Sequence, residues 1–267
     1  MCFPPGSRPP EIPSDLRPIS GGAGGSGGAT GQDVVLTSTD GATFRAFLAA
    51  GQGDIGVVIA PDVRGLHPFY HELTERFASA GVHAMALDYF GRTAGTSQRP
   101  DDFAFQEHVT AARARPELIQ ADVAASVSEL KGRTGASRIF VLGFCMGGRV
   151  AFNASAEQTG LAGVVGFYGP PLKRDDRDTD APMEKLDRMR VPILGLFGGG
   201  DAGIPADAIE AFDEALTTKG LAHHLVTYPN APHSFFDRSF AQWENACADA
   251  WRRVLGFLST GVPDAVK

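Results

Sequence analysis

The sequence predicts an α/β fold in which helices cover both faces of a mostly parallel β-sheet. Short apolar runs alternate along the chain with longer segments of helical periodicity, which is the pattern of strand–helix–strand units. The run at 55–61, IGVVIAP, is apolar almost throughout, as expected of a strand buried on both faces of a parallel sheet. A chain of 267 residues, 43% of them hydrophobic, can form this fold as a single domain, which we place at residues 32–262.

The same patterns place the individual elements. Alternating apolar residues on either side of Asp40-Gly41 predict a hairpin, because this dipeptide favours tight turns. Pro68 and Gly81 mark the start and the end of the first predicted helix. The polar stretch that runs to about Val109 is expected to be a loop. In chain order we expect strands at 33–38, 43–50 and 55–61, a helix at 68–81, a strand at 82–90, a helix at 116–133, a strand at 138–144, a helix at 146–158, strands at 161–169 and 191–199, a helix at 205–219, a strand at 223–229 and a helix at about 240–258.

Residues 1–31 differ in composition from the rest of the chain. They are rich first in proline and then in glycine, and they end in GGAGGSGGATG. Such a segment buries too little apolar surface to offset the entropy that it would lose on ordering. We therefore expect a flexible tail whose removal leaves the domain unaffected.

Composition also narrows the cellular setting. The formal net charge of -7 argues against nucleic-acid binding, which usually needs a basic patch. The three cysteines are too few and too scattered for a disulfide framework and favour a reducing compartment. No stretch approaches the roughly 18 apolar residues that a membrane-spanning helix needs. We therefore expect a cytoplasmic protein that binds neither nucleic acid nor membrane.

The stretch 138–152, RIFVLGFCMGGRVAF, places a cysteine between a predicted strand and a predicted helix. Its centre, Gly143-Phe144-Cys145-Met146-Gly147, is the nucleophile-elbow pattern G-x-S-x-G with cysteine in place of serine. Glycines are expected there because a tight turn leaves no room for a Cβ atom. The N–H groups that open the following helix would stabilise an anion formed nearby. The alternative is a small buried cysteine that only packs at the end of a core strand.

Two further residues follow predicted strands in the order expected of a catalytic triad. Asp201 comes after the strand at 191–199, and His233 comes after the strand at 223–229. The order nucleophile, acid, histidine is that of the α/β-hydrolase fold. Taken alone, Asp201 could cap the next helix and His233 could be an ordinary loop histidine. Together with Cys145 they favour a Cys145–His233–Asp201 triad.

The motifs GFCMGGR, GGGDAGIP and APHSF resemble the three catalytic motifs of the dienelactone hydrolase (carboxymethylenebutenolidase) family, and the resemblance covers about residues 33–260. It implies a compact, monomeric α/β-hydrolase that opens enol-lactones in the breakdown of chlorinated aromatic compounds without a metal or cofactor. It also implies that a carboxylate takes the proton of the thiol when substrate binds. The family has a glutamate there, and this chain has Asp62, which is one methylene shorter. The N–H groups of Met146 and Val63 are expected to form the oxyanion hole.

The resemblance further implies residues that bind the substrate. Relatives hold the substrate carboxylate through two arginines. Arg92 matches the first of these, or else it is a solvated surface residue. Asp237 stands at the second position, so that Arg238 or Arg64 would have to replace the missing arginine. Tyr168 is a further candidate for contact with substrate.

Other polar residues carry weaker signals. His67 and His71 are spaced to share one helix face, but no third ligand is evident, so no metal site is predicted. The segment 173–180, KRDDRDTD, is expected to be a solvated loop near the mouth of the site, and Cys247 is expected to contribute only to packing.

Three functional interpretations remain open. The first is a dienelactone hydrolase-like enzyme acting on lactones or esters of small carboxylic acids. The second is a broader esterase or thioesterase on the same scaffold. The third is a non-catalytic binding protein that retains the pocket. In each case the expected partner is a small molecule, an ester or lactone that can be anionic.

Overall fold

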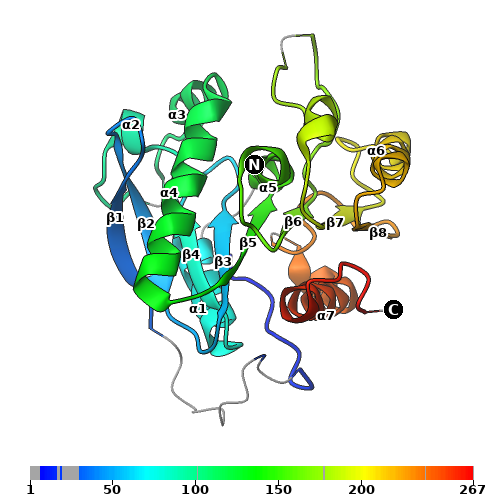
Figure 1. Cartoon of the computed structure of the whole chain (residues 1–267), viewed down its shortest axis with the longest axis horizontal. Helices are drawn as coiled ribbons and strands as arrows, with labels where there is room; N and C mark the ends of the chain where they lie inside the picture. The colour runs from blue at the N-terminus through cyan, green and yellow to red at the C-terminus, as the bar shows by residue number, and fades with distance from the viewer. Residues whose placement is uncertain are drawn as a thin grey trace.

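An eight-stranded sheet forms the centre of the molecule (Figure 1). The computed structural model describes residues 7–16, 19, 30–100, 102–176, 178–237 and 239–266. The strand order is β1-β2-β4-β3-β5-β6-β7-β8. The pairs β1–β2 and β2–β4 are antiparallel, and all other neighbours are parallel. The strands are β1 (Gln32–Thr37), β2 (Thr43–Ala49), β3 (Ile55–Ala60), β4 (His83–Leu87), β5 (Arg138–Phe144), β6 (Gly163–Phe167), β7 (Ile193–Gly198) and β8 (His223–Tyr228).

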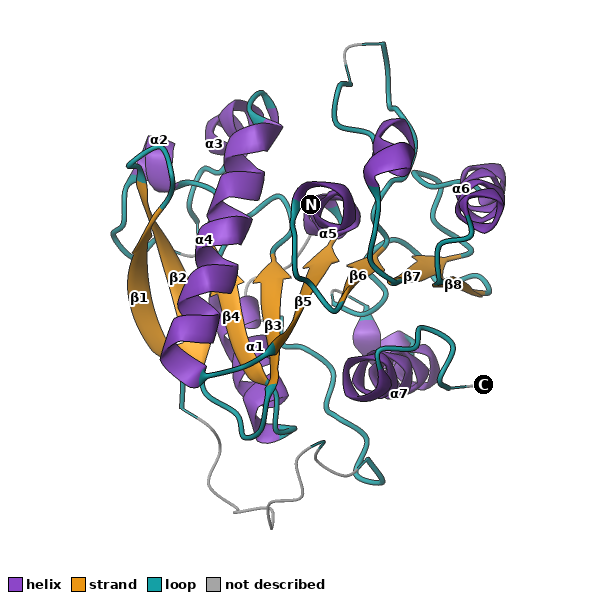
Figure 2. Ribbon diagram, viewed as in Figure 1, coloured by secondary structure: helices purple, strands orange, loops and turns teal. Residues whose placement is uncertain are grey.

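Helices cover both faces of this sheet. In the view of Figure 2, α4 crosses in front of the strands and α1 lies behind them. None of the helices within the described residues is long and apolar enough to cross a membrane. The α-helices are α1 (Pro68–Ser79), α2 (Gly91–Ala94), α3 (Gln106–Arg113), α4 (Pro116–Thr134), α5 (Met146–Glu157), α6 (Ala206–Lys219) and α7 (Glu244–Thr260), and two 3-10 helices are η1 (Pro182–Arg188) and η2 (Phe240–Gln242).

The predicted α/β fold is confirmed, and every predicted strand has its counterpart. The strand expected at 138–144 coincides with β5, and the strands expected at 33–38 and 43–50 form the antiparallel hairpin β1–β2. The parallel strands β3, β5, β6, β7 and β8 all end at the same edge of the sheet. In such a sheet, ligands bind at the carboxyl ends of the strands. The loops that carry the predicted triad therefore meet at one edge.

One predicted loop is wrong. The segment from about residue 91 to Val109, expected to be irregular, contains α2 and the first half of α3. The sequence gives little sign of α3 because the helix has only 8 residues and Val109 is its single buried residue. A helix with one buried position leaves no repeating apolar pattern to recognise. The 3-10 helix η1 was missed in the same way, since only Pro182 is buried there.

The prediction of a flexible tail is also wrong for residues 7–16. Pro9 and Pro10 are buried, and Ile12 and Leu16 pack against the core. The carbonyl oxygen of Pro10 accepts the indole N–H of Trp251 in α7 at 3.1 Å. Three ion pairs join the segment to α1 and α7, namely Arg8–Glu72, Glu11–Arg76 and Asp15–Arg252. These residues form an N-terminal strap across two helices rather than a tail.

Candidate active site

Cys145 occupies a strained turn between β5 and α5. Its φ is 56° and its ψ is -113°, a conformation that residues other than glycine adopt only when the surroundings enforce it. A Cβ atom on Gly143 would lie 1.9 Å from the carbonyl oxygen of Gly147, and one on Gly147 would lie 2.0 Å from that of Ala60. Both glycines are therefore required, as the motif predicts. The cysteine side chain is half-buried.

The predicted acid and base meet at the same edge of the sheet. The Nδ1 atom of His233 lies 2.6 Å from Oδ2 of Asp201, while Oδ1 of Asp201 accepts the N–H of Gly203 at 2.9 Å. Because an ionised carboxylate can only accept, Nδ1 carries the proton and Nε2 is left to act as a base. The helix α6 begins without a side-chain cap. Asp201 is therefore not the helix cap that the alternative interpretation required.

Backbone contacts hold this pair in place. The N–H of Gly200 donates to the carbonyl oxygen of Ala231 at 2.9 Å. A Cβ atom on Gly198 would lie only 2.3 Å from the same oxygen. The loops that carry Asp201 and His233 are thus packed backbone against backbone, which limits their independent movement.

Tyr168 lies between His233 and the turn that carries Cys145. Its ring centroid lies 4.9 Å from that of His233 and 6.1 Å from that of Phe144, the residue before Cys145. Burial raises the pKa of the Tyr168 phenol well above its usual value, and the nearby charges of Asp237 and Cys145 raise it further. The hydroxyl donates to Oδ2 of Asp237 at 2.7 Å. The residue predicted to bind substrate therefore lies beside the triad, with its hydroxyl bonded to a buried carboxylate.

The end of β3 lies against the nucleophile elbow. A Cβ atom on Gly147 would overlap the carbonyl oxygens of the last residue of β3 and of the residue after it, at 2.0 and 2.4 Å. This contact brings the loop with Val63 to the start of α5. Met146 is the first residue of α5, and the first N–H groups of a helix have no intrahelical acceptor. Both residues of the predicted oxyanion hole are thus on segments that touch.

Asp62 is fully buried beside this contact. Its Oδ1 accepts the N–H of Arg64 at 2.7 Å, and its Oδ2 lies 3.8 Å from Nε2 of His67. The pKa of the buried Tyr89 is raised first by burial and then by the charges of Asp62 and Cys145. The carboxylate and the thiol therefore both act on the same tyrosine at this end of the sheet.

A small cavity opens at the nucleophile. Its volume is about 130 Å³, close to the roughly 150 Å³ of an apolar cavity that holds benzene. Cys145 and Met146 lie in its wall with apolar side chains from α4 and with Arg113 and Arg174. The cavity can hold a small acyl group or a single ring.

Among the described residues, the structure does not bring the arginines predicted to bind substrate to the cavity at Cys145. Arg92 donates from three nitrogens to the carboxylates of Asp40 and Asp122, at 2.6 to 2.9 Å. Its guanidinium ties α2 to α4, so we do not carry it forward as a substrate ligand. Arg64 lines a different cavity from the one at Cys145. Arg238 lies outside the described residues.

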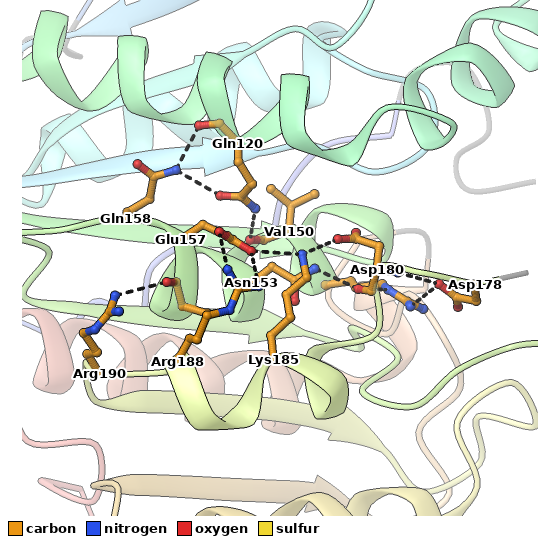
Figure 3. A network of polar contacts seen from close by, with 12 residues as sticks. Gln120, Val150, Asn153, Glu157, Gln158, Asp178, Asp180, Lys185, Arg188 and Arg190 are labelled. Atoms are coloured by element: carbon orange, nitrogen blue, oxygen red, sulfur yellow. Dashed lines mark hydrogen bonds and ion pairs between the residues drawn. The ribbon is translucent and has the colours of Figure 1, made fainter.

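The loop at 173–180 reaches the site, as predicted, but is less solvated than expected. Asp178 is buried and pairs with Arg149 of α5, with Oδ1 2.6 Å from Nη2. Figure 3 shows that the following residues are also tied to α5, because Asn153 donates to the carbonyl oxygen of Asp180 and Lys185 contacts Asp180 and Glu157. Sequence reasoning missed Arg149 as part of the site wall. The only related signal in the sequence is the excess of acidic residues in this loop, and it does not show that Arg149 is the residue that pairs with one of them.

Metal-binding potential is limited to the weak pair already mentioned. His67 is the residue before α1 and His71 lies in its first turn, but no group of three His, Cys, Asp or Glu side chains suited to a metal occurs among the described residues. Cys247 is buried in α7, and burial raises the pKa of its thiol to about 12. It contributes to packing, as predicted.

Comparison with known proteins gives one consistent match. Residues 44–261 match the model of the dienelactone hydrolase family. A protein of Salmonella typhimurium provisionally named carboxymethylenebutenolidase is 27% identical over 245 residues, which is 87% of this chain and 88% of its own. One of Saccharolobus solfataricus is 27% identical over 258 residues, 84% of this chain and 96% of its own. The crystal structure of a provisionally named dienelactone hydrolase from Klebsiella pneumoniae has a TM-score of 0.72 at 24% identity and covers 86% of this chain and 99% of that one, which shows a shared fold. The chain belongs to the dienelactone hydrolase family.

Proposed function

We propose that this protein hydrolyses esters or lactones of small carboxylic acids, with Cys145 as nucleophile, His233 as general base and acid, and Asp201 as the group that orients the histidine. Membership of a hydrolase family supports the reaction class. The observation that carries the residue assignment is the 2.6 Å contact between His233 Nδ1 and Asp201 Oδ2 at the strand edge where β5 presents Cys145.

In the first half of the proposed reaction, the thiolate of Cys145 attacks the carbonyl carbon. The carbonyl electron pair moves to oxygen, and the oxyanion accepts the N–H groups of Met146 and Val63. Hydrogen-bond donors that are already fixed in place stabilise the oxyanion more strongly than water does, because they need not reorganise as charge develops. The C–O bond then breaks, and the leaving alcohol or enol takes up the proton that Asp62 accepted from the thiol of Cys145. A thioester on Cys145 remains.

In the second half, His233 Nε2 takes a proton from water, which attacks the thioester. The new tetrahedral intermediate collapses, the C–S bond breaks, and the acid and the thiol are released. Asp201 stabilises the imidazolium that forms when His233 takes the proton from water, without itself becoming protonated, and the imidazolium then returns this proton to the sulfur of Cys145.

Asp62 has a separate proposed role, as the acceptor of the thiol proton. A free thiol has a pKa of about 8.5, so that only a few per cent is thiolate near neutrality. The buried carboxylate close to the elbow would accept that proton when substrate binds. Its shorter side chain makes the backbone position of the 62–64 loop important.

Two features favour the broader small-ester activity over strict dienelactone specificity. Arg92 is engaged by Asp40 and Asp122, and a buried carboxylate, Asp237, occupies the position of the family's second arginine. The carboxylate of a dienelactone would therefore lack both expected partners. The cavity at Cys145, at about 130 Å³, suits a small acyl group.

The test is a substrate panel with a matched pair of cysteine variants. p-Nitrophenyl esters of increasing acyl length and a dienelactone are assayed with the wild type, with Cys145→Ala and with Cys247→Ala. We expect Cys145→Ala to retain at most a few per cent of the activity and Cys247→Ala to retain most of it. Turnover by Cys145→Ala at the wild-type rate would refute the nucleophile assignment. No turnover of any substrate by the wild type would favour the binding-protein alternative.

A further inference from the structure

A second cavity, larger than the one at Cys145, lies against the loops that follow β3 and β4. Its volume is about 250 Å³. We call it the arginine cavity, after Arg45, Arg64 and Arg99 in its wall. As far as the described residues go, its lining has no residue in common with the lining of the Cys145 cavity.

Arg99 brings a donor without an acceptor to this wall. Its side chain is only 8% exposed, and Nη1 lies 2.5 Å from the buried Oδ2 of Asp88, while Nη2 donates to the carbonyl oxygen of Gly95 at 3.1 Å. Its Nε is buried and has no hydrogen-bond partner among the described residues. A buried donor left in this state destabilises the fold, because it has lost its hydrogen bonds to water without gaining others. A ligand oxygen at this position would remove that penalty.

His71 contributes a second polar atom of the same kind. Its ring stacks on Phe47 with centroids 4.3 Å apart, and its Nε2 is buried without a hydrogen-bond partner in the part of the chain that the structure describes. Burial is the main cause that lowers the pKa of His71 to about 4, with the charge of Arg45 acting in the same direction. The imidazole is therefore neutral near pH 7 and can offer one hydrogen bond to a ligand.

The remaining wall combines charge with apolar surface. Arg45, whose side chain is 5% exposed, pairs through Nη2 with Asp33 at 2.7 Å. The Cζ atom of Arg99 lies 5.1 Å from the ring centroid of Phe103, and Phe105 lines the same cavity. Since Nη1 and Nη2 of Arg99 are already engaged, its Nε can donate one hydrogen bond to a carboxylate oxygen. The phenyl rings suit an apolar body.

We propose that the arginine cavity binds a small organic carboxylate, with the carboxylate against Arg99 and the apolar part against Phe103 and Phe105. Its volume of about 250 Å³ accommodates one aromatic ring with its carboxylate, since benzene alone occupies a cavity of roughly 150 Å³. The ligand is a separate molecule and not the acyl group of the substrate, because the two linings do not overlap among the described residues. The proposal does not depend on the triad.

Benzoate titrated into the full chain, followed by calorimetry, tests the site. The main variant is Arg99→Lys, which keeps a cation beside Asp88 but removes the Nε donor. The matched control is Arg133→Lys on the exposed face of α4, where Arg133 pairs with Glu129. We expect benzoate to bind the wild type and the control equally, and Arg99→Lys to bind at least about tenfold more weakly. Equal affinity in all three proteins, or no binding to the wild type, would overturn the proposal.

Two further measurements keep the proposal falsifiable. If Arg99→Lys does not fold, His71→Phe retains the stacking on Phe47, removes Nε2 and is expected to weaken binding severalfold. Iodoacetamide labelling of Cys145 should proceed at the same rate with and without benzoate. Protection of Cys145 that persists in the Arg99 variant would place the benzoate at the catalytic cavity and refute the separate site, as would binding of inorganic phosphate in preference to benzoate.

Discussion

Replacing Asp178 by asparagine should destabilise the protein and loosen the wall of the catalytic cavity. Asp178 and Arg149 are both buried, with side chains 4% and 5% exposed, and their ion pair joins the 173–180 loop to α5. Asparagine has the same shape but no charge, so the guanidinium of Arg149 would remain buried without its anion. Removing one partner of a buried pair typically costs about 3–5 kcal/mol.

The pKa of Asp178 gives an independent figure. Burial by itself raises this pKa, but the N–H groups of Arg174 and Asp180 and the guanidinium of Arg149 together lower it to about 2. Compared with an ordinary value near 3.8, this corresponds to about 2 kcal/mol that favours the folded state when the group is ionised. Because Arg149 also donates to the carbonyl oxygens of Asp180 and Leu172, part of its pairing survives the substitution. We therefore expect the free energy of unfolding to fall by about 3 kcal/mol, which lies between the value from the pKa and the upper end of the range for a broken buried pair.

Thermal melting at pH 7 provides the measurement, with Asp176→Asn, an exposed carboxylate of the same loop, as the control. A loss of about 3 kcal/mol should lower Tm by roughly 6–12 °C in a domain of this size, and the control should stay within about 2 °C of the wild type. The sign of the pH effect follows from the lowered pKa. The stabilisation is complete above the unfolded value near 3.8 and is lost as pH falls towards about 2. The difference in Tm between the wild type and Asp178→Asn should therefore become smaller as the pH falls from 3.8 to about 2. Equal Tm values for both variants at pH 7, or a gap that does not change with pH, would refute the reasoning.

The remaining predictions concern the triad, the strap and the thiols. Asp201→Asn should lower kcat by about 10²- to 10⁴-fold in ester hydrolysis with little change in Tm, because the histidine loses the group that fixes its tautomer; activity near that of the wild type would mean that another acid serves. Deletion of residues 1–16 should lower Tm by at least about 4 °C in a melting curve, since it strands a buried indole donor and exposes apolar surface; an unchanged Tm would show that the strap contributes nothing. Asp62→Asn should reduce kcat/KM strongly at pH 7 and less at pH 9, where a thiol of pKa about 8.5 ionises unaided; a pH–rate profile parallel to the wild type would exclude the proton-acceptor role. Iodoacetamide should label Cys145 well before Cys247, whose thiol is buried with its pKa raised to about 12; mass spectrometry of the labelled peptides gives the order, and labelling of Cys247 first would contradict the prediction.

The sheet and the loops that carry the proposed triad could be predicted because their signals are local. Each residue of the proposed triad comes within five residues of the end of a strand, and Gly143 and Gly147 stand on either side of Cys145 in the sequence. The residues that shape the site could not be predicted in the same way. The bond from Arg92 to Asp122 spans 30 residues and that from Arg149 to Asp178 spans 29. A charged residue in a sequence shows that it needs a partner but not which one, so the sequence does not reveal that Asp40 and Asp122 engage Arg92.

The contact between the N-terminal strap and α7 sets an order of events during biosynthesis. The residues of the strap are made first, but Trp251, which donates to Pro10, is added 241 residues later. At synthesis rates of about 5–20 residues per second, this delay is roughly 12 to 48 s. Throughout that time Ile12 and Leu16 have no complete docking surface, so they are open to chaperones and proteases. The strap can therefore dock only after α7 has been made and has packed on the domain. A tag fused ahead of residue 7 would lie close to the segment that docks in this late step.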